Sequence, residues 1–146
     1  MIKDIKIIKL VTHNDERGFF REILRLSEHN NEFKNGQLSH SEVKKNVLKA
    51  WHGHKIQSQW TYVISGLIKV VLYDFREKSP TYEKYQEFLV GKGHAPAVYY
   101  FPSGVLHSYK CIIGPMNILY LTSGTFDSNE EIRISKNNQM IKYHWK

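Results

Sequence analysis

Apolar residues gather in short runs along the chain, and each run ends at Gly, Pro, Asn or Asp. The runs are rich in Val, Ile, Tyr and Phe, which favour pleated, half-buried strands over helices. We expect strands at residues 5–11, 18–26, 46–54, 59–65, 67–75, 97–102 and 117–124. Short strands at regular spacing, with few helical stretches between them, predict an all-β sandwich or barrel.

The connections between these runs are less regular. Ser65-Gly66 separates two apolar runs and predicts a tight hairpin turn. Residues 27–33 carry polar, cap-type side chains with weak helical periodicity, so a short helix is the most that we expect there. The polar tail, residues 135–146, either frays or covers one end of the barrel.

Composition places the chain among ordinary globular proteins. Its 146 residues are 41% hydrophobic and 24% charged, which predicts one domain over residues 1–146. No apolar run approaches the roughly 18 residues of a membrane helix. Residues 1–10 alternate charge with Ile and indicate a first strand rather than a signal peptide. The single cysteine, Cys111, excludes an internal disulfide and fits a cytoplasmic location.

The net charge is +7, which is compatible with nucleic acid, an anionic membrane surface or an anionic small molecule as partner. The lysines are scattered, and no block of five or more like charges is present. The chain also lacks a helix-turn-helix, zinc-finger or aromatic RNA-binding signature. We therefore expect no nucleic acid and no membrane as partner, and a phosphate-bearing small molecule fits the charge.

Three histidines and a glutamine form the strongest chemical pattern. Residues two apart in a strand face the same side, so His52 and His54 present their imidazoles together. Gln59 opens the next strand, and a Pro-x-Gly turn at 102–104 precedes His107. These spacings match the two half-motifs of a cupin. We predict a cupin-like double-stranded β-helix, or jelly-roll, barrel in which the four side chains share one pocket.

Longer segments carry a more specific resemblance. They are residues 14–22, 37–40, 44–52, 66–76, 79–82 and 101–107. In order and spacing the chain resembles the dTDP-4-dehydrorhamnose 3,5-epimerases. The resemblance implies a homodimeric cupin-like barrel that binds a nucleotide-diphosphate sugar without a metal or other cofactor.

The resemblance also implies roles for individual residues. His52 would be the base that removes a proton next to the sugar ketone. Lys49 stands where the family has an arginine that holds the diphosphate, and His107 matches a histidine lining the sugar site. Three further residues match positions that contact the nucleotide, partly across the dimer: Arg17, Glu22 and Gln37.

The chain departs from the family at the chemistry itself. Gln59 replaces the catalytic lysine, and Phe126, which has no hydroxyl, replaces the catalytic tyrosine. The aspartate that pairs with the catalytic histidine belongs to a C-terminal segment that we expect this chain to lack. The stretch 51–55, followed by Gln59, resembles instead the nucleotide-sugar 3,4-ketoisomerases, which are also small cupins.

Both reactions begin by removing a proton from the carbon next to a ketone, and histidine is the natural base near neutral pH. We predict an isomerase acting on a nucleotide-linked, dTDP-type 4-keto-6-deoxy hexose in deoxysugar or surface-polysaccharide biosynthesis. His52 would be the base and His54 its partner acid or base. The expected substrate-binding residues are Arg17, Glu22, Gln37, Lys49, Gln59 and His107.

Two other functions remain open from the sequence. The set His52, His54, Gln59 and His107 also follows the usual metal-ligand layout of a cupin, although an amide stands where a carboxylate is expected. Because the family's Tyr, Lys and Asp are missing, a non-catalytic sugar-nucleotide binder is the second alternative.

Overall fold

The regular secondary structure of the protein is almost entirely β-strand in a computed structural model that describes residues 1–146. The strands are β1 (Lys6–Lys9), β2 (His13–Asp15), β3 (Gly18–Phe20), β4 (Gln37–Val43), β5 (Leu48–His54), β6 (Gln59–Asp74), β7 (Tyr85–Gly91), β8 (Ala97–Phe101), β9 (Val105–Thr122) and β10 (Glu131–Arg133). The helical content is one 3-10 turn, η1 (Leu26–Glu28). No helix has the length and apolar character needed to cross a membrane.

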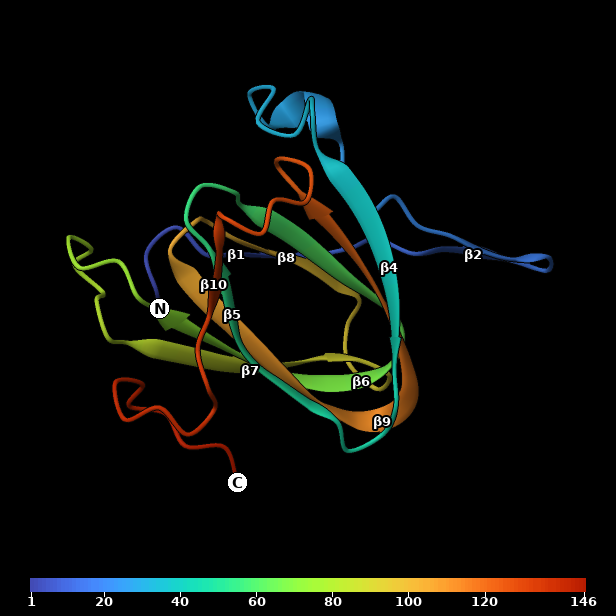
Figure 1. Ribbon diagram of the computed structural model, residues 1–146. Helices are drawn as coiled ribbons and strands as arrows, with labels where there is room; N and C mark the ends of the chain where they lie inside the picture. The colour runs from blue at the N-terminus through green and yellow to red at the C-terminus, as the bar shows by residue number, and fades with distance from the viewer.

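Eight strands form one antiparallel sheet that curls around a central space (Figure 1). The order is β1-β8-β6-β9-β5-β10, while β4 also pairs with β9 and β7 also pairs with β6. The long strands β6 and β9 are hydrogen-bonded neighbours along their length. The first part of β6 pairs with β8 and its second part with β7. This arrangement confirms the predicted all-β, cupin-like jelly roll.

The predicted hairpin at Ser65-Gly66 is wrong. β6 continues through this point, and its register against β9 shifts on both sides of Ser65. Gly66 has φ of +85°, a conformation that side-chain-bearing residues rarely adopt. The irregularity bends the strand and lets it change partner from β8 to β7, so the chain does not reverse.

Other sequence predictions hold only in part. Residues 27–33 contain only the end of η1 and turns, and the strand expected at 18–26 stops at Phe20. The strand β4 and the first half of β9 were not predicted. β4 alternates exposed with partly buried residues, but its side chains are mostly polar on both faces, which hides the strand period.

Trp51 of β5 packs on the side of this strand that faces away from the barrel interior. Its side chain is buried in a cluster with Tyr73, Leu106 and Ile141. Ile141 belongs to the C-terminal tail and is only 1% exposed, so the tail covers this outer side of β5. Since neighbours in a strand face opposite sides, packing of Trp51 outside the barrel directs the next residue, His52, toward its interior.

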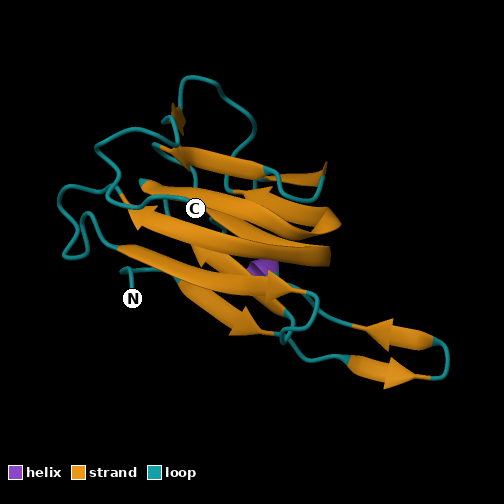
Figure 2. Ribbon diagram, turned by 90° about the horizontal axis from the view of Figure 1, so that it is seen from below, coloured by secondary structure: helices purple, strands orange, loops and turns teal.

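The strands β2 and β3 form a hairpin that extends away from the barrel (Figure 2). Phe19 and Phe20 on this hairpin are 64% and 66% exposed. Isolated two-stranded hairpins are at best marginally stable in water, and adjacent exposed aromatic side chains add to that cost. The hairpin therefore presents an apolar surface that the chain itself does not cover.

Candidate active site

A cavity of about 750 Å³ opens into the barrel. This volume is in the range that accommodates small-molecule ligands. The expected site residues that line it are Gln37, Lys49, His52, His54, Gln59 and His107. Phe126 lines it as well, so the position of the family's tyrosine faces the cavity without a hydroxyl.

The three imidazoles lie together in this cavity. His52 and His54 are alternate residues of β5, and His107 lies opposite His52 on the neighbouring β9. The His52 ring centroid is 4.9 Å from that of His54 and 4.9 Å from that of His107. Nδ1 of His52 is 3.2 Å from Nε2 of His107. The alternation of β5 and the Pro-x-Gly turn thus place these rings as the sequence predicts.

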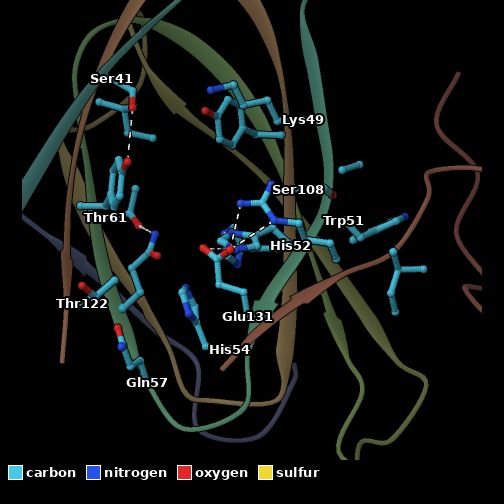
Figure 3. Close-up of a pocket in the computed structure, with 18 of the residues that line it drawn as sticks. Ser41, Lys49, Trp51, His52, His54, Gln57, Thr61, Ser108, Thr122 and Glu131 are labelled. Atoms are coloured by element: carbon cyan, nitrogen blue, oxygen red, sulfur yellow. Dashed lines mark hydrogen bonds and ion pairs between the residues drawn. The ribbon is translucent and has the colours of Figure 1, made fainter. Parts of the chain in front are cut away.

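Each histidine of β5 has a carboxylate partner, which the sequence analysis missed. Nε2 of His52 lies 3.2 Å from Oε1 of Glu131. Figure 3 shows the two side chains facing each other in the cavity. Nδ1 of His54 lies 2.8 Å from Oε1 of Glu130. The short strand β10 brings both carboxylates here by pairing with β5. A carboxylate thus lies beside His52 after all, but it is Glu131 of β10 and not the aspartate of the family's C-terminal segment.

The surroundings lower the pKa values of His52, His107 and Glu131. Burial lowers the pKa of His52, and the nearby His54 and Arg133 lower it further, although Glu131 acts in the opposite direction. Burial also holds the pKa of His107 well below its usual value. Burial raises the pKa of Glu131, but the hydrogen bond from Arg133 and the neighbouring His52 outweigh it, so the pKa is lowered. His52 is thus a neutral imidazole beside an ionised carboxylate.

This pairing fixes the proton positions on His52. Nε2 donates to Glu131, so Nδ1 carries the lone pair and accepts from Nε2 of His107. His54 is almost fully buried, whereas 31% of the His52 side chain is exposed. His52 is therefore the more accessible base of the two. Nε2 of His54 and Nδ1 of His107 have no hydrogen-bond partner.

Two of the four residues of the metal alternative, His52 and Gln59, already have hydrogen-bond partners in the protein. Both nitrogens of His52 face protein partners, Glu131 and His107. The amide nitrogen of Gln59 lies 2.9 Å from the Thr61 hydroxyl, to which it donates a hydrogen bond. No group of three or more His, Cys, Asp or Glu side chains is placed to hold a metal ion.

Cations reach the cavity from two strands. Lys49 of β5 lines it, as expected, and so does Arg133 of β10, which the sequence analysis missed. Nη2 of Arg133 lies 2.9 Å from Oε2 of Glu131. A three-residue strand carries no usable periodicity, so only the acidic pair 130–131 followed by Arg133 could have drawn attention to this segment.

Two expected substrate-binding residues lie outside the cavity of their own chain. Arg17 lies in the turn of the β2–β3 hairpin, where its Nη2 pairs with Oδ2 of Asp15 at 2.6 Å. Glu22 pairs with Arg25 at 2.8 Å. Neither residue lines the cavity of its own chain.

The chain is similar to known proteins in sequence and in fold. The family model described as dTDP-4-dehydrorhamnose 3,5-epimerase matches residues 1–146. The spore coat polysaccharide biosynthesis protein SpsL of Bacillus subtilis is 36% identical over 149 residues, covering 99% of this chain and 97% of SpsL. The probable low-salt glycan biosynthesis epimerase Agl13 of Haloferax volcanii is 30% identical, covering 76% of this chain and 71% of Agl13. Among solved structures, the dTDP sugar isomerase of Desulfovibrio desulfuricans G20 superimposes with a TM-score of 0.85 at 27% identity, covering 99% and 92% of the two chains.

Proposed function

This chain belongs to the dTDP-4-dehydrorhamnose 3,5-epimerase family, and we propose that it is an isomerase acting on a dTDP-linked 4-keto-6-deoxy hexose. The observation that carries the proposal is the Glu131–His52 pair, a neutral histidine oriented by a carboxylate inside a sugar-sized cavity. The names of SpsL and Agl13 support a place in surface-polysaccharide or glycan biosynthesis.

The reaction begins when His52 takes a proton from the carbon next to the ketone. Glu131 holds the ring through Nε2 and stabilises the imidazolium that forms, while the lone pair on Nδ1 receives the proton. His107 occupies that lone pair in the free protein, so the substrate takes its place there. Lys49 lines the same cavity and supplies positive charge for the diphosphate. Gln37 and Gln59 offer amide groups to the nucleotide and sugar.

The fate of the proton distinguishes two products. Return of the proton to the same carbon from the opposite face gives epimerisation. The family's catalytic tyrosine is replaced here by Phe126. Delivery to the neighbouring carbon, with the hydroxyl proton on oxygen 3 passing to oxygen 4, moves the carbonyl, as in a 3,4-ketoisomerase. The second pair, His54 with Glu130, favours carbonyl migration because it places a second acid or base beside His52.

The test is hydrogen exchange in deuterated water with a panel of dTDP-4-keto-6-deoxy hexoses, followed by NMR. We expect carbon-bound deuterium with the natural protein and a loss of about a hundredfold in His52→Asn. His94→Asn, which changes an exposed histidine outside the cavity, should behave like the natural protein. Deuterium at carbon 3 or 5 without carbonyl movement identifies an epimerase, and deuterium at carbon 4 with the carbonyl at carbon 3 identifies a ketoisomerase. Binding without any exchange would contradict the proposal and favour a non-catalytic binder.

We also propose that the protein acts as a cytoplasmic homodimer joined through the β2–β3 hairpin. The exposed Phe19 and Phe20 would be covered by the second chain, and Arg17 would reach the partner's cavity from the same hairpin. Light scattering after size exclusion should give twice the chain mass of 17.2 kDa. A Phe19→Ser, Phe20→Ser variant should run as a monomer, and a monomeric natural protein would contradict the proposal.

A further inference from the structure

Arg133 and His52 share one carboxylate. Oε1 of Glu131 lies 3.2 Å from Nε2 of His52. Oε2 of the same residue accepts from Nε and Nη2 of Arg133 at 3.2 and 2.9 Å. The register of the two strands explains the arrangement, because Arg133 of β10 lies directly opposite His52 of β5. The charge of Glu131 is therefore divided between an imidazole and a guanidinium.

The two partners of Glu131 differ in their freedom to move. The side chains of Glu131 and His52 are 12% and 31% exposed, whereas that of Arg133 is 73% exposed. Ion pairs with an exposed partner are weak and easily exchanged for other anions. Arg133 also lines the cavity, and three of its five N–H groups are not used by Glu131. It is thus available to an anion inside the cavity.

A phosphate group is a strong competitor for this guanidinium. The planar fork of arginine matches phosphate oxygens in pairs, and a diphosphate carries more negative charge than one carboxylate. Lys49 of β5 is a second cation that lines the cavity, and it attracts such an anion to the same space. The polar partners of Glu131 are His52 and Arg133, and Lys49 is not among them, so Arg133 is the cation that connects the anion to the base.

We infer that Arg133 couples anion binding to the strength of the base: a phosphate in the cavity draws the guanidinium away from Glu131, whose carboxylate then acts on His52 alone. The inference rests on the proposed function for its choice of a diphosphate sugar as ligand. The other charged or titratable groups facing His52 are His54 on its own strand and His107 on β9. Neither is hydrogen-bonded to Arg133, so their effect on His52 does not depend on where the guanidinium lies. The substrate thereby raises the basicity of His52 when it binds. In the free protein, the ion pair of Arg133 with Glu131 keeps that basicity lower.

The experiment follows the Cε1–H signal of His52 by NMR through pH titrations, with and without saturating inorganic pyrophosphate, at constant ionic strength. In the natural protein, pyrophosphate should raise the pKa of His52. In Arg133→Gln the pKa should already be raised without the anion, and pyrophosphate should bind about tenfold more weakly. Arg133 is exposed, so this variant should fold normally.

Two further variants separate the coupling from the direct charge of the anion. In Glu131→Gln only the direct effect remains, so pyrophosphate should raise the pKa of His52 by less than in the natural protein. Lys49→Gln should weaken binding yet leave the full rise at saturation. Equal rises in the natural protein and Glu131→Gln, or unchanged pyrophosphate affinity in Arg133→Gln, would overturn the inference. These results are independent of deuterium exchange into keto sugars, which decides the proposed function separately.

Discussion

Replacing Glu131 with glutamine tests how His52 is made into a base. The amide keeps the size of the side chain but removes its charge, which lies 3.2 Å from Nε2 of His52. When His52 takes a proton from the sugar, its positive charge is stabilised by Glu131. At that separation the attraction is about 5 kcal/mol for an effective dielectric constant of about 20.

The actual attraction is smaller than this energy, because Glu131 also forms an ion pair with Arg133 and His52 is partly exposed to water. About half of it, 2–3 kcal/mol, is expected to be lost in Glu131→Gln, which corresponds to a rate about 30- to 150-fold lower. The amide either accepts through Oε1 or donates through Nε2, so the proton position on His52 is no longer fixed.

The assay is the rate of deuterium incorporation into a dTDP-4-keto-6-deoxy hexose, measured as kcat and kcat/KM. We expect the loss mainly in kcat, since Glu131 contacts the base and no substrate group is assigned to it. Glu42→Gln, an exposed carboxylate on β4, is the matched control and should keep the natural rate. A Glu131→Gln enzyme within about threefold of the natural rate would refute the role of this carboxylate.

Four further predictions follow from single features of the structure. Because the pKa of His52 is lowered, kcat/KM should stay on its plateau as pH falls through histidine's usual value of about 6.5 and decline only below it, which a pH-rate profile measures. The pKa of Asp74 is lowered to about 2: burial raises it, but hydrogen bonds from Arg76, Ser79 and Thr81 outweigh burial. In urea unfolding Asp74→Asn should therefore lose about 2 kcal/mol at pH 7, a difference that shrinks as pH falls from about 4 toward 2. Ile141→Ala should lower the free energy of unfolding by about 2–4 kcal/mol, since this side chain is 1% exposed against Trp51; an unchanged urea midpoint would show that the tail does not pack there. Dialysis against a chelator should leave the exchange rate unchanged, and a loss restored by one added metal would contradict the absence of a coordinating cluster.

The barrel and half of its site could be predicted from the sequence because they depend on local patterns. The two-residue period of a strand is enough to place His52 and His54 on one face, and a Pro-x-Gly turn marks the approach of His107. The cavity-facing position of Phe126 followed from the family resemblance. In each case the residues that carry the signal are neighbours in the chain.

The rest of the site depends on pairing between distant segments. Glu130 and Glu131 meet β5 from nearly 80 positions away, as their hydrogen bonds to His54 and His52 show. The strand that carries Glu131 has only three residues, too few to reveal a period. The hairpin error at Ser65-Gly66 has the same origin, since a glycine turn and a glycine bulge look alike until the partners of both half-strands are known.

The most direct measurement is the structure of the protein with a dTDP-4-keto-6-deoxy hexose in the cavity. We predict that the carbon next to the ketone lies about 3–3.5 Å from Nδ1 of His52, with the diphosphate held by Lys49 and Arg133. A sugar bound with its ketone turned away from His52, or a nucleotide bound only outside the barrel, would contradict the account.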